Sequence, residues 1–124
     1  MKKQILIVDD EDDVRAIATL GLQIGAGWTV LTASSGAEGI AIATQHQPDA
    51  ILLDLMMPDM DGRATLQQLK QYPVTQSIPV ILMTAKMQLS EQRSFNDLEV
   101  AAVFTKPFRP LTLAQQIIDA LTWI

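Results

Sequence analysis

The sequence predicts an α/β fold in which a doubly wound parallel sheet of five strands is flanked by five helices. Five short apolar segments have strand length, and five longer segments with helical periodicity alternate with them. Most strand segments are apolar at consecutive positions, which is typical of strands buried on both faces of a parallel sheet. Strict alternation of strand and helix then implies right-handed crossovers between parallel strands.

The expected elements follow each other in regular order along the chain. Each strand segment is four to six residues long, the usual length in such sheets. The strand segments are residues 5–8, 28–33, 50–53, 79–84 and 101–105. The helix segments are residues 12–25, 35–46, 62–71, 88–98 and 110–123.

Two of the helix segments carry an apolar stripe at three- and four-residue steps. Such a stripe is typical of a helix that packs one face against a sheet, so we expect both stripes to be buried. In the first helix the stripe consists of Val14, Ile17, Gly21 and Ile24. In the last helix it consists of Leu113, Ile117, Leu121 and Ile124.

Composition limits the classes of function that are open to the chain. Its 124 residues, 48% of them hydrophobic, predict a single domain over residues 1–124 with no output domain. The net charge of -5 disfavours a nucleic-acid surface, because phosphate binding depends on clustered Lys and Arg. There is no cysteine, and the single histidine, His46, cannot build a zinc or iron centre alone. No apolar run has the length of a membrane span, so we expect a soluble, cytoplasmic protein without membrane contact.

Polar side chains occur at the ends of four of the five expected strands. Asp9 and Asp10 follow the first strand, and Asp54 ends the third. Thr84 ends the fourth strand, and Lys106 follows the fifth. The carboxyl ends of parallel strands lie at one edge of the sheet, where ligands bind in folds of this class. We therefore expect three carboxylates to converge there with a hydroxyl and an ammonium beside them.

Three carboxylates at one site repel each other unless a cation is present. An all-oxygen ligand set selects a hard cation, and Mg²⁺ fits better than Ca²⁺ because it needs few protein ligands and keeps waters and a phosphate. An Asp carboxylate can also accept a phosphoryl group covalently. The set predicts Mg²⁺-dependent phosphoryl chemistry, although any one Asp taken alone is equally a turn former or a helix cap.

Four motifs resemble those of the receiver domain of two-component response regulators, which are CheY-like proteins. The resemblance covers the chain from Ile5 to Leu121 and implies a flavodoxin-like strand order of 2-1-3-4-5. It implies a phosphoprotein that assists its own phosphorylation and dephosphorylation and is not otherwise an enzyme. The motifs are "ILIVDDE", "DAILLDLMMPDMDG", "PVILMTA" and "VFTKPF".

The resemblance implies a role for each polar residue at the strand ends. Asp54 would be the phosphoacceptor, Thr84 would hydrogen-bond the phosphoryl group, and Lys106 would pair with it. The ligands of Mg²⁺ would be Asp54, Asp10 directly, Asp9 mostly through water, and the backbone carbonyl of Met56.

The resemblance also implies partners by class. The phosphodonor would be a phosphohistidine on a histidine kinase or a histidine phosphotransfer protein. A downstream protein target would bind the face made by the fourth helix, the fifth strand and the fifth helix. The chain would be a monomer or a weak phosphorylation-dependent dimer, and this domain alone would bind no nucleic acid.

Some residues near the motifs have a plainer interpretation or depart from the family pattern. Glu11, Asp12 and Asp13 are acids of a first helical turn, where they complement the helix dipole, and Asp12 is the expected N-cap. Val103 stands where the family typically has an aromatic residue three positions before the lysine. Phe104 should face the opposite side of the strand as core, because side chains alternate along a strand.

Two other functions share part of this pattern. A Mg²⁺-dependent phosphohydrolase with an Asp nucleophile would use the same acids, Thr and Lys. Enzymes of the haloacid-dehalogenase kind carry a second Asp two residues after the nucleophile, however, and this chain has Met56 there. A flavodoxin-like cofactor protein would need a Ser/Thr/Gly phosphate cradle after the first strand, where this chain is acidic. The signalling switch is therefore the favoured function.

Overall fold

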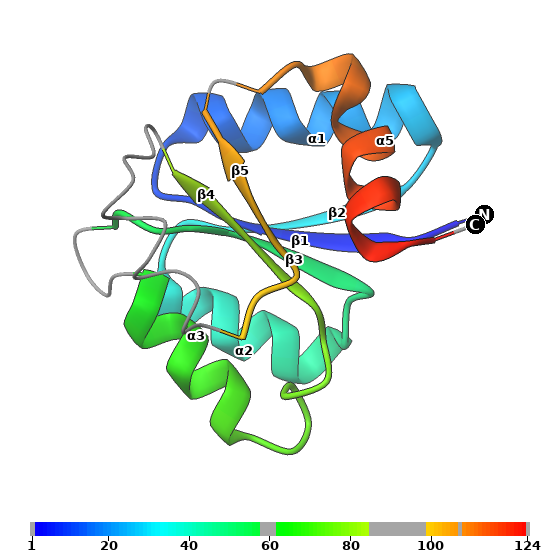
Figure 1. The fold of residues 1–124 in the computed structure, drawn as a ribbon. Coiled ribbons are helices and arrows are strands. Elements are labelled where there is room, and N and C mark those ends of the chain that lie inside the picture. The colour runs from blue at the N-terminus through cyan, green and yellow to red at the C-terminus, as the bar shows by residue number, and fades with distance from the viewer. Residues whose placement is uncertain (1, 58–61, 85–98, 107, 124) are drawn as a thin grey trace.

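The computed structural model describes residues 2–57, 62–84, 99–106 and 108–123. They form a five-stranded parallel sheet in the order β2-β1-β3-β4-β5 (Figure 1). The predicted fold class and strand order are therefore confirmed. The chain runs from β1 outward to β2 and then returns to β3 on the other side of β1, so the strand order reverses between β1 and β3.

The elements lie close to their expected positions. The strands are β1 Gln4–Val8, β2 Thr29–Ala33, β3 Ala50–Asp54, β4 Val80–Thr84 and β5 Ala102–Thr105. The helices are α1 Asp12–Ala26, α2 Gly36–His46, α3 Gly62–Gln71 and α5 Pro110–Leu121. The described residues thus contain four of the five predicted helices, and the one expected over residues 88–98 lies outside them. Among the same residues, no helix is both long enough and apolar enough to cross a bilayer.

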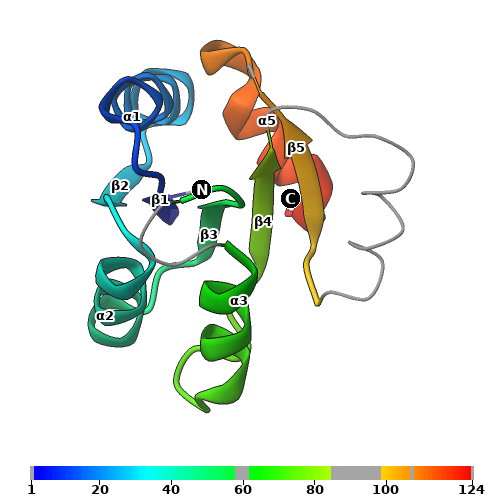
Figure 2. The same cartoon turned by 90° about the vertical axis from the view of Figure 1, so that its left-hand side faces the viewer.

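Helices cover both faces of the sheet, as Figure 2 shows, with α1 and α5 on one face and α2 and α3 on the other. Successive residues of β1 serve the two cores in turn. Leu6 and Val8 join the core beneath α2 and α3, whereas Ile5 and Ile7 join the core beneath α1 and α5. This two-sided burial explains why the central strands are apolar at consecutive positions.

The buried face of α1 differs from the predicted stripe. Gly21 is buried as expected, together with Ala18, but Ile17 and Ile24 are 46% and 66% exposed. The reason is the close approach of α5, since a Cβ atom on Gly21 would lie 2.3 Å from the carbonyl oxygen of Pro110. The buried face of α1 therefore consists of Ala18, Gly21 and Leu22, and Ile17 and Ile24 lie beside it in solvent.

The C-terminal helix agrees with its prediction at Leu113 and Ile117, whereas Leu121 is only partly buried and Ile124 lies outside the described residues. Leu113 and Ile117 of α5 are fully buried against the sheet. Just beyond the helix, Trp123 lies edge-on to the buried Trp28, with ring centroids 5.7 Å apart, and the Lys3 ammonium lies 4.5 Å from the Trp123 centroid. These contacts fasten the end of α5 to the amino-terminal edge of the sheet, away from the strand ends that carry the acidic residues.

Candidate functional site

The acidic residues lie where the strand order reverses, at the carboxyl ends of β1 and β3. The parallel register places Val8 beside Leu53. Asp9 and Asp54, which follow these residues, therefore leave neighbouring strands at the same level. Thr84 is the last residue of β4, the next strand along, and is buried. The topology thus brings three of the predicted site residues to one edge of the sheet.

Asp9 is fully buried and is held by hydrogen bonds from several parts of the chain. Its N–H donates to the carbonyl of Ala33 at the end of β2, at 3.0 Å. Its Oδ1 accepts the Glu11 N–H at 2.9 Å, and its Oδ2 accepts from Lys106 Nζ at 2.7 Å. Its carbonyl accepts from Arg15 Nη1 at 2.6 Å. A buried carboxylate needs such partners, and here they also fix its orientation.

Lys106 lies between the two buried carboxylates. Its Nζ is 2.7 Å from Asp9 Oδ2 and 3.4 Å from Asp54 Oδ1. Its backbone N–H donates to the carbonyl of Thr84 at 2.7 Å, which fixes the point where the side chain leaves β5. Burial disfavours the charged ammonium, but the hydrogen bonds and charges of Asp9 and Asp54 outweigh this effect and raise the pKa of Lys106. The lysine therefore stays protonated at neutral pH.

Asp54 is buried with incomplete charge compensation. Its Oδ1 accepts the backbone N–H of Met56 at 3.2 Å. Burial, followed by the Asp9 charge, raises the pKa of Asp54 from 3.8 to about 6, although Lys106 and the Met56 N–H act in the opposite direction. Without a metal, the ionised Asp54 therefore lowers the stability of the folded state at neutral pH.

Gly62 begins α3 directly beside Asp54. Its N–H donates to the carbonyl of Leu55 at 2.9 Å. A Cβ atom at this position would lie 2.6 Å from both the Asp54 carbonyl oxygen and the Leu55 Cα. Only glycine fits without displacing the backbone, so this residue allows α3 to begin against the end of β3.

A metal ion can be held by the carboxylates of Asp9, Asp10 and Asp54. One oxygen from each lies within 4.8 Å of the others. Two of these residues are buried, whereas Asp10 is exposed and gives the site an open side. An all-oxygen donor set with an excess of negative charge fits a hard divalent cation. Met56, by contrast, is 74% exposed, and its side chain has no oxygen atom that could bind such an ion.

The start of α1 corrects one prediction. The N-cap is Glu11 rather than Asp12, and the Glu11 side chain makes no cap hydrogen bond. The reason is that Asp9 Oδ1 accepts the Glu11 N–H and closes the turn before the helix begins. Asp12 is instead the first helical residue and forms an ion pair with Arg15. Glu11 also lies at the rim of the site, since its Oε1 is 4.0 Å from Lys106 Nζ.

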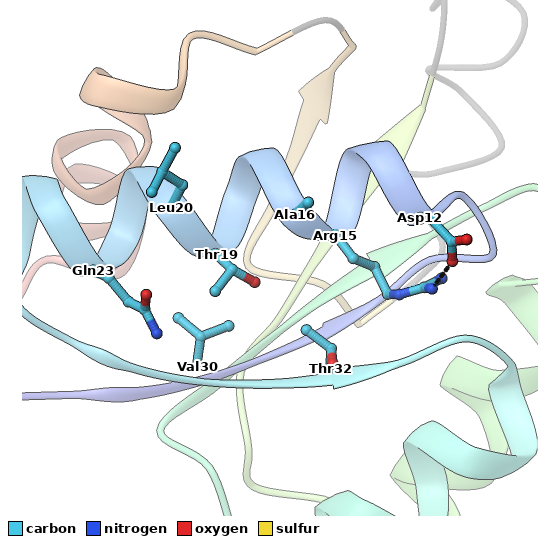
Figure 3. A pocket seen from close by; sticks show the side chains of 8 residues that line it. All are labelled: Asp12, Arg15, Ala16, Thr19, Leu20, Gln23, Val30 and Thr32. Atoms are coloured by element: carbon cyan, nitrogen blue, oxygen red, sulfur yellow. Dashed lines mark hydrogen bonds and ion pairs between the residues drawn. The ribbon is translucent and has the colours of Figure 1, made fainter.

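Arg15 was not singled out from the sequence, although it contacts the site. Its partner is the backbone carbonyl of Asp9, and a backbone acceptor leaves no signature in a sequence pattern. Figure 3 shows Arg15 and Asp12 at one end of a pocket of about 540 Å³ between α1 and the edge strand β2. None of the three clustered carboxylates lines this pocket.

Comparisons with known proteins agree with this geometry. The chain matches the family described as the response regulator receiver domain over residues 5–118. It is 38% identical over 105 residues to the DNA-binding dual master transcriptional regulator RpaA of Synechocystis sp., covering 85% of this chain and 43% of that protein. It is also 38% identical over 117 residues to the phosphate regulon transcriptional regulatory protein PhoB of Pseudomonas aeruginosa, covering 93% of this chain and 50% of that protein.

Solved structures show the same likeness. The chemotaxis protein CheY4 of Vibrio cholerae superimposes with a TM-score of 0.88 at 26% identity, covering 97% of this chain and 99% of that one. The chain therefore matches a whole chemotaxis protein of this fold, whereas it spans about half the length of the curated relatives it matches.

The raised pKa of Asp54 predicts how the stability of the metal-free protein depends on pH. The folded state binds the Asp54 proton more tightly than the unfolded chain, so this residue supports folding below pH 3.8, and the contribution is lost as the pH rises through about 6. We expect Asp54→Asn to raise the free energy of unfolding at pH 7 in EDTA by about 3 kcal/mol. The gain should shrink toward pH 4.

Chemical denaturation of both proteins across this pH range tests the prediction. Asp119→Asn, which removes an exposed carboxylate on α5, gives the background effect of losing one negative charge. A gain for Asp54→Asn that is no larger than this background, or that grows as the pH falls, would contradict the prediction.

Proposed function

The chain belongs to the response regulator receiver domain family, and we propose that it is a phosphorylation-dependent signalling switch whose phosphoacceptor is Asp54. The observation that carries the proposal is the position of Asp54, which is buried at the end of β3 with Lys106 3.4 Å away and the carboxylates of Asp9 and Asp10 beside it. In this role the protein is a regulator that assists its own phosphorylation and dephosphorylation, rather than an enzyme with a separate substrate.

The proposed reaction forms one bond and breaks another. A carboxylate oxygen of Asp54 bonds to phosphorus while the P–N bond of a phosphohistidine breaks, and the leaving imidazole keeps the electron pair. The acceptor loses its own charge and gains about two negative charges. Lys106 would pair with the transferred group, and the Thr84 hydroxyl at the end of β4 would donate a hydrogen bond to it.

The residues that would hold Mg²⁺ are Asp9, Asp10 and Asp54, with the backbone carbonyl of Met56 as a further ligand. When bound, the ion neutralises negative charge on the carboxylates and on the transferred group. Together with the ammonium of Lys106 it brings the formal charge of the three carboxylates to zero before transfer and to about one negative charge afterwards. The all-oxygen cluster supports this assignment.

We propose that the phosphodonor protein, a histidine kinase or a histidine phosphotransfer protein, binds at α1. This helix begins at the site, so a protein that holds its phosphohistidine over Asp54 would cover the adjoining turns of α1. Ile17, Leu20 and Ile24 are exposed on this helix at 46%, 57% and 66%. Apolar side chains grouped in solvent beside a reactive site favour a protein contact.

We propose that the downstream protein target binds the face made by β5, α5 and the helix expected over residues 88–98, a helix that lies outside the described residues. Val103 packs toward the core beneath α2 and α3, whereas Phe104 packs toward the core beneath α1 and α5. The predicted alternation along β5 is thus confirmed, and Val103 supplies no aromatic ring for gating. A cavity of about 410 Å³ on this face is lined by Val103, Phe104, Thr105, Phe108, Arg109 and Gln116.

A phosphohydrolase is the second candidate, because it would use the same acidic cluster. Met56 occupies the position where such enzymes carry the Asp that transfers the proton. A thioether cannot donate or accept that proton. The phosphoryl group should therefore accumulate on Asp54 instead of turning over rapidly, which favours the switch.

Phosphorylation with a small donor tests the central proposal. After incubation with Mg²⁺ and acetyl phosphate, we expect intact mass spectrometry to show one phosphoryl group, which hydroxylamine removes as expected for an acyl phosphate. Asp54→Ala should carry none, whereas the control Asp119→Ala should be modified like the wild type. Repeated turnover of acetyl phosphate without an adduct would favour the hydrolase instead.

The metal assignment predicts different effects for two nearby exposed acids. Asp10→Ala should abolish measurable Mg²⁺ binding in calorimetric titration, because it removes a direct ligand. Asp13→Ala should leave binding nearly intact, because Asp13 lies in the first turn of α1 and outside the cluster. Equal losses in the two variants would show that only the overall negative charge matters, and would contradict the assignment.

The placement of the phosphodonor on α1 predicts a selective defect. Leu20→Glu should slow phosphotransfer from a phosphohistidine protein about tenfold or more, because a charge replaces an apolar contact. Its phosphorylation by acetyl phosphate should be unchanged. The matched control is Val74→Glu, at a similarly exposed apolar residue between α3 and β4. Equal protein phosphotransfer rates for the two variants would argue against this surface.

A further inference from the structure

Arg15 makes a contact to the site that the proposed chemistry does not use. Its Nη1 donates to the carbonyl of Asp9 at 2.6 Å, and its other terminal nitrogen pairs with Asp12. The Arg15 side chain is only 18% exposed, whereas that of Asp12 is 89% exposed. Figure 3 shows the two side chains joined at the start of α1. The guanidinium thus bridges the end of β1 and the first turn of the helix that follows.

We propose that Arg15 is a positioning residue for the metal site, which orients Asp10 by holding the peptide unit between Asp9 and Asp10. The carbonyl of Asp9 and the N–H of Asp10 belong to one planar peptide unit. A bond that fixes the direction of the Asp9 carbonyl therefore also fixes the orientation of this peptide plane, and with it the position of the Asp10 Cα. The inference rests on the proposed function, in which Asp10 is a direct ligand of Mg²⁺.

Asp10 needs such support because it is the exposed member of the cluster. Asp9 is anchored on the strand side by the bond from its N–H to Ala33, and its carboxylate is held by Glu11 and Lys106. Those contacts hold the N–H and the carboxylate of Asp9, but none of them involves the peptide unit between Asp9 and Asp10. Arg15, which lies in the first turn of α1 and six residues after Asp9, supplies the contact at this peptide unit.

Electrostatics alone predicts the opposite effect of removing Arg15. A positive charge near a cation site repels the cation, so its loss should tighten Mg²⁺ binding. Positioning predicts weaker binding, because a ligand that is no longer held must be ordered when the ion binds. Residues that orient metal ligands typically contribute about 10-fold or more to affinity. The sign of the change in affinity therefore distinguishes the two effects.

The test compares Mg²⁺ affinity by calorimetry in the wild type and three variants. Arg15→Gln should bind Mg²⁺ about tenfold more weakly, while its phosphorylation rate at saturating Mg²⁺ stays near that of the wild type. Arg15→Lys keeps the charge and one donor and should recover part of the affinity. Asp12→Asn is the matched control, because it removes the ion pair and leaves the bond from Arg15 to Asp9 in place.

A second measurement reads the backbone directly. In the metal-free protein, the amide resonance of Asp10 should move in Arg15→Gln and stay in place in Asp12→Asn. Unchanged or tighter Mg²⁺ binding by Arg15→Gln would overturn the inference. If that variant does not fold by circular dichroism, Arg15→Lys decides, since full wild-type affinity together with an unmoved Asp10 amide would then overturn it. Failure of the wild type to bind Mg²⁺ would contradict the proposed function instead.

Discussion

The bond between Lys106 and Asp9 is the interaction on which the site depends. It joins residues 97 positions apart at 2.7 Å, and the same ammonium lies 3.4 Å from Asp54. Without it, two buried carboxylates would face each other with no cation between them, which is strongly unfavourable. The lysine must extend from the end of β5 past the ends of β4 and β3 to reach β1. The parallel register, which brings these strand ends to one edge of the sheet, allows this reach.

The compensation provided by Lys106 is incomplete, and this makes the site sensitive to charge. One ammonium is shared between two buried acids, and Asp54 keeps a pKa raised to about 6. A divalent cation would relieve the remaining repulsion, whereas a phosphoryl group on Asp54 would compete with Asp9 for the same ammonium. A change in charge on Asp54 would thus alter the contacts of Lys106, which connect the ends of β1, β3 and β5.

The sequence allowed the strands and their polar ends to be predicted, because strand burial and connectivity together determine where Asp9, Asp54 and Lys106 lie. The face of α1 could not be predicted in the same way. Periodicity marked Ile17 and Ile24 as buried, whereas α5 approaches α1 at Gly21, and the face that is buried instead contains Ala18, Gly21 and Leu22. The roles of Glu11 and Arg15 also depend on hydrogen bonds within the turn. The Glu11 N–H donates to the Asp9 carboxylate and Arg15 donates to the Asp9 carbonyl, and side-chain patterns do not record bonds that involve the backbone.

The turn after β1 places a buried carboxylate next to an exposed one, and the proposed function gives the exposed one the binding role. Asp9 is buried and bonded through both its backbone and its carboxylate, so it belongs to the folded core as much as to the site. Asp10, one peptide unit later, is exposed. A ligand on the solvent side can gain and lose an ion without disturbing the buried bonds of its neighbour. In the same arrangement, the orientation of the exposed Asp10 carboxylate would depend on Arg15, whose contact to the site is the carbonyl of the preceding residue.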